Sequence, residues 1–468
     1  MSTSTTLTQH LSAPGVTLDS DEELAGPPRT VNPIQRRERI SSMDILRGFA
    51  LLGILVVNMD DFSGPESLHD IPLGVAKAAF LGPHAHLNLV CLFLKWIFIE
   101  SKMRGLFSML FGAGVVLLTA RAEKRGAGSQ MADIYLRRNM WLVALGVLHG
   151  TFLWHGDILF LYGFCGLMFL YPCRKLKART LFLAGNVMLA VVTVAYLHHL
   201  SAFDDFSLSH KVAAISADQH AGRQLTPEQR QVQEQWKAEV AHHVIDPKKV
   251  QAEVSDAHKG YLSDLTQDGL DYVAHMAHIL GAGAFFEELG AMLIGMALFK
   301  SGFLSAELAF GTYLKIAIIG FSISGPLYVA GMWKAYASGF YFLTLYKWIY
   351  LPYFFTEETG AIAIAAVLLM IIKSGAVRTA LRPFAAVGQT ALSNYLLTSL
   401  LCQLIFRWGA WKLYGQLEYY QLNYVVVAIW AINLVVSPLW LRAFEFGPVE
   451  WLWRSLTYWK LQPMRLRS

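Results

Sequence analysis

Long runs of apolar residues, separated by short polar or basic segments, dominate the chain from about residue 45 onward. Runs of roughly 17–25 apolar residues are long enough to cross the hydrocarbon core of a bilayer as helices. We therefore expect an all-α fold, a polytopic membrane helix bundle of about ten transmembrane helices. The expected spans lie near residues 45–60, 103–120, 138–154, 157–172, 180–199, 278–299, 308–329, 355–373, 384–406 and 422–441.

The longest polar interruption covers residues 201–276, which hold 12 Asp and Glu against 7 Lys and Arg. Within it, the segment Thr226-Pro227-Glu228-Gln229 is typical of a helix start, and Ala, Glu, Gln and Lys follow it. The pattern predicts an external helical insertion between an N-terminal membrane half, residues 36–200, and a C-terminal membrane half, residues 277–441.

The two ends of the chain differ from the apolar body. Residues 1–35 are rich in Ser, Thr, Pro and Gly and lack the basic and apolar regions of a signal peptide, which indicates a disordered cytoplasmic tail. Residues 442–468 contain Phe446–Arg454, an aromatic and amphipathic stretch, so we expect a cytoplasmic tail that lies at the membrane interface.

Composition and charge support the membrane class. The chain is 54% hydrophobic and 16% charged, which excludes an ordinary soluble protein of 468 residues. Its net charge of +5 comes from basic clusters between the apolar runs, so we expect no nucleic-acid partner. If odd-numbered helices run outward, these clusters share one side, which the positive-inside rule identifies as the cytoplasm. Both termini are then cytoplasmic, and residues 201–276 face outward.

Metal and disulfide signals are weak. The four cysteines share no CxxC spacing. The polar insertion contains several histidines, but no carboxylate or thiolate stands beside them at a diagnostic spacing, and we predict no metal site. These histidines are His210, His220, His242, His243 and His258.

The first candidate for chemistry is a short turn between two expected helices, with His149 before it and Asp157 after it. An imidazole with a carboxylate in reach can act as a general base, because the acid fixes the tautomer and stabilises the imidazolium. Two structural alternatives stay open. Asp157 could simply cap the next helix, and His149 could only hydrogen-bond across the bundle.

Two further groups of charges lie within or beside the expected spans. Lys102 and Arg104 open the second span, where they could hold an anionic group or could snorkel to the interface. Glu287 and Glu288 lie inside the sixth span. Neighbours on a helix point about 100° apart, so we expect one of them to face inward, either paired with a cation such as Arg104 or protonated.

The first and ninth expected spans contribute the remaining candidates. Asp44 and Arg47 stand at i,i+3 at the mouth of the first helix, and Asn58 stands at its far end. Arg47 could bind an anionic ligand or could anchor the helix. Thr390 and Asn394 share a face at i,i+4, which could serve a ligand or only interhelical hydrogen bonds.

Six blocks of the sequence together resemble the YeiB family of bacterial inner-membrane proteins, a family of largely unknown function. The resemblance implies a multi-pass protein of the bacterial inner membrane. The blocks, in chain order, cover residues 43–58, 106–114, 149–159, 289–298, 391–396 and 447–454.

The first-helix pattern, an acid followed by Arg47-Gly48 and an apolar run to Asn58, is also similar to that of transmembrane acyltransferases. Heparan-alpha-glucosaminide N-acetyltransferase is one of them, and the similarity covers mainly the first spans. It implies that an acyl group moves from a cytoplasmic donor, usually acetyl-CoA, to a sugar-type acceptor across the membrane. An intramembrane histidine is the key residue of such enzymes.

The leading hypothesis is a membrane acyltransferase that uses an acyl-CoA donor and an envelope glycan or small-molecule acceptor. His149 would be the general base and Asp157 its orienting acid. Lys102 and Arg104 would hold an anionic or carbonyl oxygen. Arg47, beside Asp44, would meet the donor phosphate from the cytoplasm. We expect all these groups to converge in one chamber that opens outward.

Two other classes remain. A transporter or a lipid- or solute-binding protein would use the same buried polar cavity, with Asn58, Glu287, Glu288 and Asn394 among its binding residues. A structural or sensory protein would recognise a partner through residues 201–276. Membrane lipids are expected neighbours in every case, and a homo-oligomer is left open.

Overall fold

The computed structural model describes residues 41–65, 82–124, 128–244, 246–281, 283 and 285–466 of the 468-residue chain. These residues form helices and connecting turns, with one isolated bridge between Phe444 and Arg465 and no named strand among them. The all-α prediction is confirmed. The tail expected over residues 1–35 lies outside the described residues.

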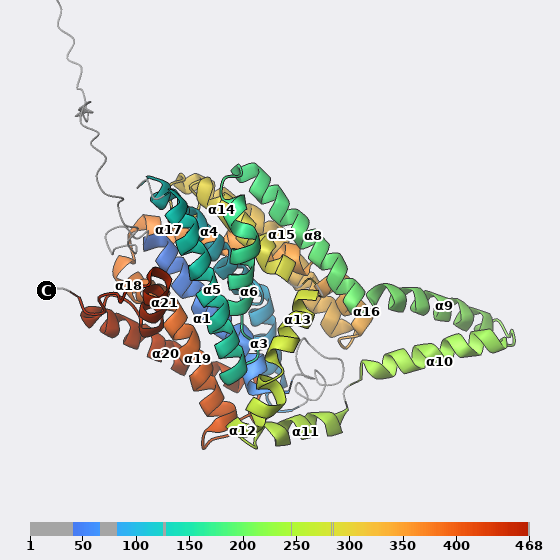
Figure 1. Cartoon of the computed structure of the whole chain (residues 1–468). Coiled ribbons are helices and arrows are strands. Elements are labelled where there is room, and N and C mark those ends of the chain that lie inside the picture. The colour runs from blue at the N-terminus through green and yellow to red at the C-terminus, as the bar shows by residue number, and fades with distance from the viewer. Residues whose placement is uncertain are drawn as a thin grey trace, which may run out of the picture.

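The helices form a bundle from which one helical arm projects (Figure 1). The helices of the first half of the bundle are α1 (Ser41–Ser63), α3 (Ala85–Phe98), α4 (Lys102–Lys124), α5 (Gly128–Phe152), α6 (Leu159–Cys165), η3 (Gly166–Leu170), α7 (Tyr171–Cys173) and α8 (Ala178–His199). Those of the arm and its return are α9 (Ala202–His220), α10 (Pro227–His242), α11 (Pro247–Ala257), α12 (Tyr261–Asp264) and η4 (Leu265–Gly269). Those of the second half are α13 (Tyr272–Gly281), α14 (Phe285–Lys300), α15 (Phe310–Ala337), α16 (Phe342–Leu345), η5 (Tyr346–Tyr350), α17 (Tyr353–Ser374), α18 (Arg378–Gln389), α19 (Ala391–Gln403), η6 (Leu404–Trp408), α20 (Tyr419–Ala443) and α21 (Pro448–Tyr458).

Six helices among the described residues are long and apolar enough to cross a membrane, and the bent pair α13 and α14 would add a seventh. The expected number of ten is not confirmed. Helix α5 carries Arg137 and Arg138 in its body. The apolar stretch Leu159–Cys173 is only about 22 Å long at 1.5 Å per residue, against about 30 Å of hydrocarbon. The six candidates are α1, α3 with α4, α8, α15, α17 and α20.

Two expected spans are broken. The span expected at 278–299 consists of α13 and α14, whose axes meet at 70°. The span expected at 384–406 is divided at Thr390 into α18 and α19. The second break has a partner in α21, because the carboxylate of Glu450 accepts hydrogen bonds from the amides of Leu392 (2.6 Å) and Ser393 (3.1 Å). A carboxylate at a helix N-terminus satisfies orphan amides and complements the helix dipole.

Glycines bring two pairs of helices into backbone contact. A Cβ on Gly48 would lie 1.9 Å from a carbonyl oxygen of α18, and one on Gly388 would lie 1.8 Å from a carbonyl oxygen of α1. The same reciprocal contact joins α4 and α14 at Gly112 and Gly295, at 2.0 and 1.9 Å. Small residues at such crossings are how membrane helices approach closely without intervening side chains.

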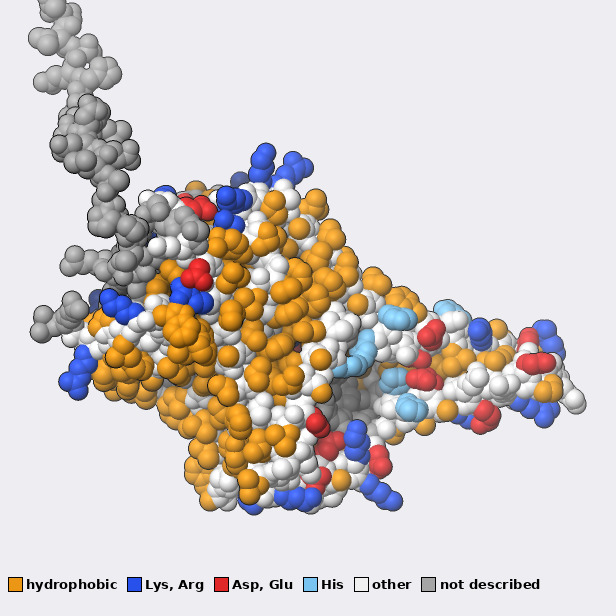
Figure 2. Space-filling model, in the orientation of Figure 1, with side chains coloured by type: hydrophobic (Ala, Val, Ile, Leu, Met, Phe, Trp, Pro, Cys, Tyr) orange, Lys and Arg blue, Asp and Glu red, His pale blue; other side chains and the backbone are white. Residues whose placement is uncertain are grey.

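The surface separates the bundle from the arm. Hydrophobic side chains cover the visible flank of the bundle, whereas charged side chains gather at its ends and along the arm (Figure 2). Helices α9 and α10 run in opposite directions along the arm (Figure 1). The predicted helix start at Thr226 is confirmed, because its hydroxyl accepts from the Gln229 amide in a reciprocal capping box.

Candidate functional site

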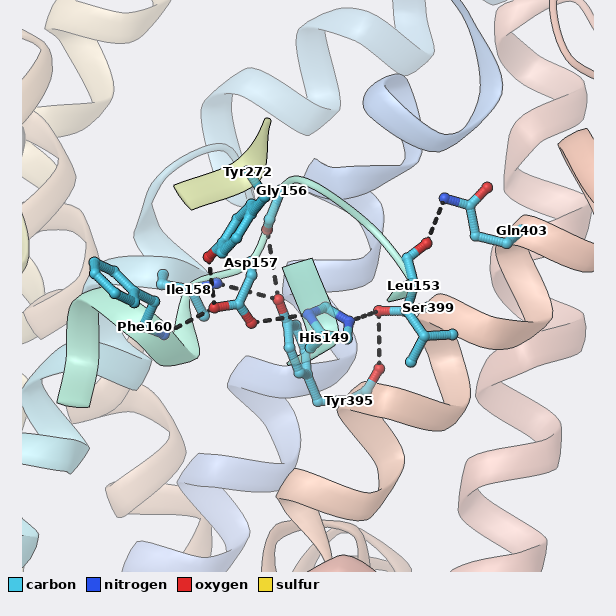
Figure 3. Close-up of polar contacts among 10 residues, drawn as sticks. All are labelled: His149, Leu153, Gly156, Asp157, Ile158, Phe160, Tyr272, Tyr395, Ser399 and Gln403. Carbon is cyan, nitrogen blue, oxygen red and sulfur yellow. Dashed lines mark hydrogen bonds and ion pairs between the residues drawn. The ribbon is translucent and has the colours of Figure 1, made fainter. Parts of the chain in front are cut away.

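The last turn of α5 and the loop that follows it bury an imidazole against a carboxylate. His149 and Asp157 are 1% and 5% exposed. His149 Nδ1 lies 2.8 Å from Asp157 Oδ1 (Figure 3). The structure therefore brings together the two residues that the sequence suggests as base and orienting acid.

The second oxygen of Asp157 has its own partners. It accepts hydrogen bonds from the amide of Phe160, at 2.8 Å, and from the hydroxyl of Tyr272 on α13, at 3.2 Å. The capping alternative is thus also present, since Phe160 lies in the first turn of α6. Both oxygens of Asp157 are occupied, which fixes the carboxylate relative to the imidazole.

A serine completes the line on the other side of the imidazole. The Oγ of Ser399, on α19, lies 3.0 Å from His149 Nε2 and 3.2 Å from the carbonyl oxygen of Tyr395. The single Ser399 hydroxyl proton is donated either to that carbonyl oxygen or to Nε2; with the His149 proton on Nδ1 toward Asp157, Nε2 can accept it when the hydroxyl rotates. Figure 3 shows the imidazole between the carboxylate and the hydroxyl. This order of serine, histidine and acid is the arrangement that activates a hydroxyl as a nucleophile.

Glycines and aromatic rings shape the surroundings of this line. A Cβ on Gly146 would lie 2.7 Å from Asp157 Oδ2, and one on Gly150 would lie 2.2 Å from the Tyr272 ring. The Tyr395 ring centroid is 5.0 Å from that of His149. The polar line therefore lies in a tightly packed, aromatic environment, where each hydrogen bond is electrostatically stronger than in water.

A cavity of about 230 Å³ is lined by Tyr395, whose ring contacts His149, and by Ile158, which follows Asp157. One end of the cavity is basic, and its lining there includes Arg47, Arg121, Arg138 and Arg454. Apolar residues from α1, α4, α5, α6 and α19 line most of the remainder, among them Leu51, Ile54, Phe107, Leu110, Leu142, Leu159 and Leu392. A basic end followed by an apolar interior suits an anionic headgroup attached to an acyl chain.

The arginines at the basic end are held in different ways. Arg47 pairs with Asp44 at 3.1 Å. The guanidinium of Arg138 lies 3.9 Å above the ring of Trp453 on α21. Arg138 and His149 are eleven positions apart on α5, which corresponds to roughly 16 Å along the helix. One helix thus carries both an arginine of the basic end and the imidazole.

A second buried polar cluster lies between α4, α14 and α17, and we call it the glutamate cluster. It consists of Arg104, Glu287, Glu288, Glu357 and Glu358. Arg104 pairs with Glu287, as the sequence suggests. Glu288, Glu357 and Glu358 are each at most 4% exposed. The cluster therefore contains four carboxyl groups and one guanidinium group.

Several atoms of the glutamate cluster lack hydrogen bonds. Both side-chain oxygens of Glu358 and Oε2 of Glu357 have no hydrogen-bond partner among the residues that the structure describes. Both side chains reach α4 at the same point, because a Cβ on Gly105 would lie 3.1 and 3.3 Å from their Oε1 atoms. Buried carboxyl groups without such partners are costly, so the cluster is a candidate for ligand or proton binding.

The two cations of the second expected span do not join His149, so the single chamber expected from the sequence is absent from the described part of the chain. Lys102 Nζ donates to the carbonyl oxygens of Trp96 (2.9 Å) and Glu100 (3.2 Å) and lies 3.5 Å above the Tyr328 ring. Arg104 belongs to the glutamate cluster. The polar groups form separate sites because each cation already has partners on neighbouring helices.

The remaining candidates are also dispersed. Asp44 and Arg47 line the basic end of the cavity. Asn394 donates to Ser437 on α20, at 2.8 Å, which matches the interhelical alternative. Asn58 is half-buried on α1, and no hydrogen bond connects it to the other candidates within the described ranges.

Sequence comparisons place the chain among known proteins. It is 28% identical to "Uncharacterized protein YxaH" of Bacillus subtilis, over 94% of this chain and 99% of the relative. It is 29% identical to "Uncharacterized protein YeiB" of Escherichia coli, over 90% of this chain and 96% of the relative. The chain is thus similar over nearly its whole length to YeiB and YxaH. Residues 298–460 also match a family model described as "Protein of unknown function (DUF418)".

The match to YeiB over 90% of this chain confirms the resemblance seen in the sequence. The segment matched by the family model contains Glu357, Glu358 and Ser399, whereas His149 and Asp157 precede it. No solved structure matches the chain.

The sequence reasoning did not single out Glu357, Glu358 or Ser399, nor Tyr272, Tyr395 and Arg138 around them. Glu357 and Glu358 are adjacent acids in an apolar run, the same signal that singled out Glu287 and Glu288. Ser399 gives no comparable signal, since a lone serine in an apolar helix is common and its partner lies 250 positions earlier.

Proposed function

We propose that this membrane protein is an acyltransferase that passes an acyl group from an acyl-CoA donor to a hydroxyl of an envelope or small-molecule acceptor. The observation that carries the proposal is the buried line of Ser399, His149 and Asp157. Tyr395, whose ring centroid is 5.0 Å from that of His149, also lines a cavity with a basic end and an apolar interior.

The first half-reaction loads the serine. Ser399 Oγ attacks the thioester carbonyl of the donor, and His149 Nε2 takes the hydroxyl proton while Asp157 holds the Nδ1 proton. The carbon–sulfur bond then breaks, and the leaving thiolate receives that proton from His149. The acyl group is now an ester of Ser399.

The second half-reaction transfers the acyl group from Ser399 to the acceptor. The acceptor hydroxyl attacks the ester carbonyl, and its proton passes to His149 and then to Ser399 Oγ as the carbon–oxygen bond breaks. The acyl group ends on the acceptor and the serine is regenerated. His149 and Ser399 do not themselves line the cavity, so Tyr395, which lines it and contacts the imidazole, must move for the donor carbonyl to reach Ser399.

The basic end of the cavity supports binding of the donor. Arg47 and Arg138 present guanidinium groups that suit the phosphates of coenzyme A, and the apolar interior suits the acyl chain. We place this end at the cytoplasmic face of the bacterial inner membrane and the arm outside, with both termini cytoplasmic. Cysteines introduced singly into the arm at Gln224 and into α21 at Ser455 test this orientation. Only the first should react with an impermeant maleimide added to intact spheroplasts.

The decisive experiment is acid-quenched labelling in lipid nanodiscs. Wild-type protein incubated with radioactive acyl-CoA and no acceptor should retain label on Ser399, and Ser399→Ala should retain none. His149→Gln should lower the labelling rate by about 10³-fold or more, as loss of a general base and its nucleophile pairing does.

The chain offers a matched control for the serine. Ser324 on α15 is equally buried and also bonds back to a carbonyl four residues earlier, at 2.9 Å, without a histidine neighbour. Ser324→Ala should label like wild type. Equal labelling of Ser399→Ala and wild type would refute the serine mechanism.

The glutamate cluster supports a second candidate, a transporter that couples solute movement to protons or cations. Its carboxyl groups lie between three helices and outnumber the one guanidinium, as expected of a proton relay. In proteoliposomes, Glu357→Gln together with Glu358→Gln should then abolish pH-gradient-driven flux while His149→Gln leaves it unchanged. The opposite pattern would favour the transferase.

A further inference from the structure

The root of the arm holds three potential metal ligands that belong to neither site above. Asp205 lies in the first turn of α9, while Glu239 lies in α10 and His243 immediately follows it. The two α10 residues are spaced i,i+4 and so share one helix face. Asp205 is 2% exposed.

The ligand atoms converge on one point. His243 Nε2 lies 3.5 Å from Glu239 Oε1 and 3.8 Å from Asp205 Oδ2, and all three atoms lie within 4.8 Å of one another. Tetrahedral zinc with bonds of about 2.0–2.2 Å places its ligand atoms about 3.4 Å apart. The observed spacings come close to that value.

Two of these atoms are buried without a hydrogen bond. Neither Asp205 Oδ2 nor His243 Nε2 has a hydrogen-bond partner in the described part of the chain. An ordinary histidine–carboxylate pair would close to hydrogen-bond distance, since leaving both atoms unpaired costs free energy. A cation between them would satisfy both.

The imidazole is also held in a fixed orientation. Its ring stacks on Phe342 of α16 at 4.0 Å and 14°, and Tyr346 lies edge-on at 6.2 Å. Phe342 and Tyr346 belong to the apolar cluster that packs the arm against the bundle. Figure 2 shows histidine and acidic side chains gathered where the arm leaves the bundle. A ligand fixed by its neighbours requires little ordering when a metal binds.

We propose that Asp205, Glu239 and His243 bind one divalent transition-metal ion of the zinc class at the root of the arm. One imidazole nitrogen and two carboxylate oxygens suit zinc or cobalt better than magnesium or calcium, which prefer oxygen alone. Three protein ligands leave a fourth position for water or an exogenous group. The ion would join α9 to α10.

We predicted no metal site from the sequence, although His243 was among the histidines noted in the insertion. Only Glu239 and His243 are close in sequence, while Asp205 lies on another helix and reaches them through the antiparallel arm. The proposal is independent of the acyl-transfer proposal, because it involves none of the same residues.

Metal titration of the full-length protein, purified without a histidine tag and stripped with EDTA, tests the site. We expect one equivalent of Zn²⁺ per chain, measured by competition with a chromophoric chelator, and a tetrahedral d–d spectrum with Co²⁺. Glu239→Gln and His243→Gln should weaken binding by at least about tenfold, since loss of even an outer partner costs 10–100-fold.

His242→Gln is the matched control, because His242 is the adjacent, exposed histidine of the same helix turn. It should bind like wild type. The proposal fails if the wild type binds no Zn²⁺, if His242→Gln weakens binding as much as His243→Gln, or if Glu239→Gln leaves affinity and the Co²⁺ spectrum unchanged. Glu239 is partly exposed, so its variant should fold and keep the result interpretable.

Discussion

The line through His149 and the glutamate cluster both bury ionisable groups, but they differ in how completely those groups are paired. Both nitrogens of His149 and both oxygens of Asp157 have partners within 3.2 Å. Glu358 has no hydrogen-bond partner for either oxygen in the described chain. The hydrogen bonds of the first region fix its geometry, whereas the second region contains acceptor oxygens that a proton or a ligand could still bind.

The largest expected loss of stability comes from a substitution in the fully paired region around His149. Asp157→Leu should destabilise the folded state by about 3–5 kcal/mol. The reason is that the buried imidazole, the Tyr272 hydroxyl and the Phe160 amide would each lose their hydrogen bond to the carboxylate. Denaturation in detergent micelles measures this cost. Asp157→Asn keeps the shape and part of the bonding and should cost less. A loss below about 1 kcal/mol for the leucine variant would show that the pairing contributes little.

A pair of glycine substitutions compares how rigid the two regions are. Gly146→Ala should cost about 1–3 kcal/mol, because its new Cβ would lie 2.3 Å from the backbone nitrogen of Phe160. Gly105→Ala meets glutamate side-chain atoms and no backbone, namely Oε1 and Cγ of Glu357 and Oε1 of Glu358 at 3.1–3.3 Å, so it should cost less than about 1 kcal/mol. Unfolding midpoints of the two variants, measured side by side, test the order. Equal costs would contradict a difference in rigidity.

The glutamate cluster should tolerate loss of a carboxyl group that the paired region would not. Glu358→Gln removes no hydrogen bond and relieves repulsion among four acids, so it should change stability by less than about 1 kcal/mol or increase it. Asp157→Asn, measured in the same assay, should be clearly destabilising. Similar destabilisation by both would mean that Glu358 is held by contacts as strong as those of Asp157.

The smallest effect comes from an exposed pair outside both regions. The hydrogen bond from His84, 2.9 Å away, lowers the pKa of Glu418 from its ordinary value of 4.5. A depressed folded-state pKa stabilises the fold above the unfolded-state value, and this contribution is lost as pH falls through the folded-state value. His84→Gln should therefore flatten the stability profile slightly on the acid side of about pH 4.5. If wild type and His84→Gln have the same dependence of stability on pH, the pair contributes no measurable stability.

Local chain connectivity decides which contacts the sequence could reveal. His149 and Asp157 are eight positions apart in one helical hairpin, so their pairing was predictable from the turn alone. Ser399 reaches His149 only because α19 packs beside the end of α5. Lys102 was expected beside His149, but the break between α3 and α4 at Ser101, where φ is 61°, leaves the carbonyl oxygens of Trp96 and Glu100 as acceptors for its ammonium group.

Hydropathy recovered the helical class but not the interruptions of the helices. A window average does not detect that the amides of Leu392 and Ser393 are capped by Glu450, which comes nearly sixty residues later. It also counts Leu159–Cys173 and the arginine-bearing α5 as spans, although one is short and the other is charged. Tertiary contacts, which a linear pattern omits, determine where such helices stop.

At the contact between α1 and α18, which lines part of the cavity, the two main chains pack directly against each other. Where Gly48 meets α18 and Gly388 meets α1, the main chains touch directly, so a shift of one helical turn, about 5.4 Å, would force peptide groups into one another. Where α5 meets α21 the contact is made by side chains instead, because Arg138 stacks on Trp453, whose indole donates to the Arg138 carbonyl oxygen at 2.8 Å. The main-chain contact of α1 with α18 therefore leaves less room for adjustment than the side-chain contact of α5 with α21.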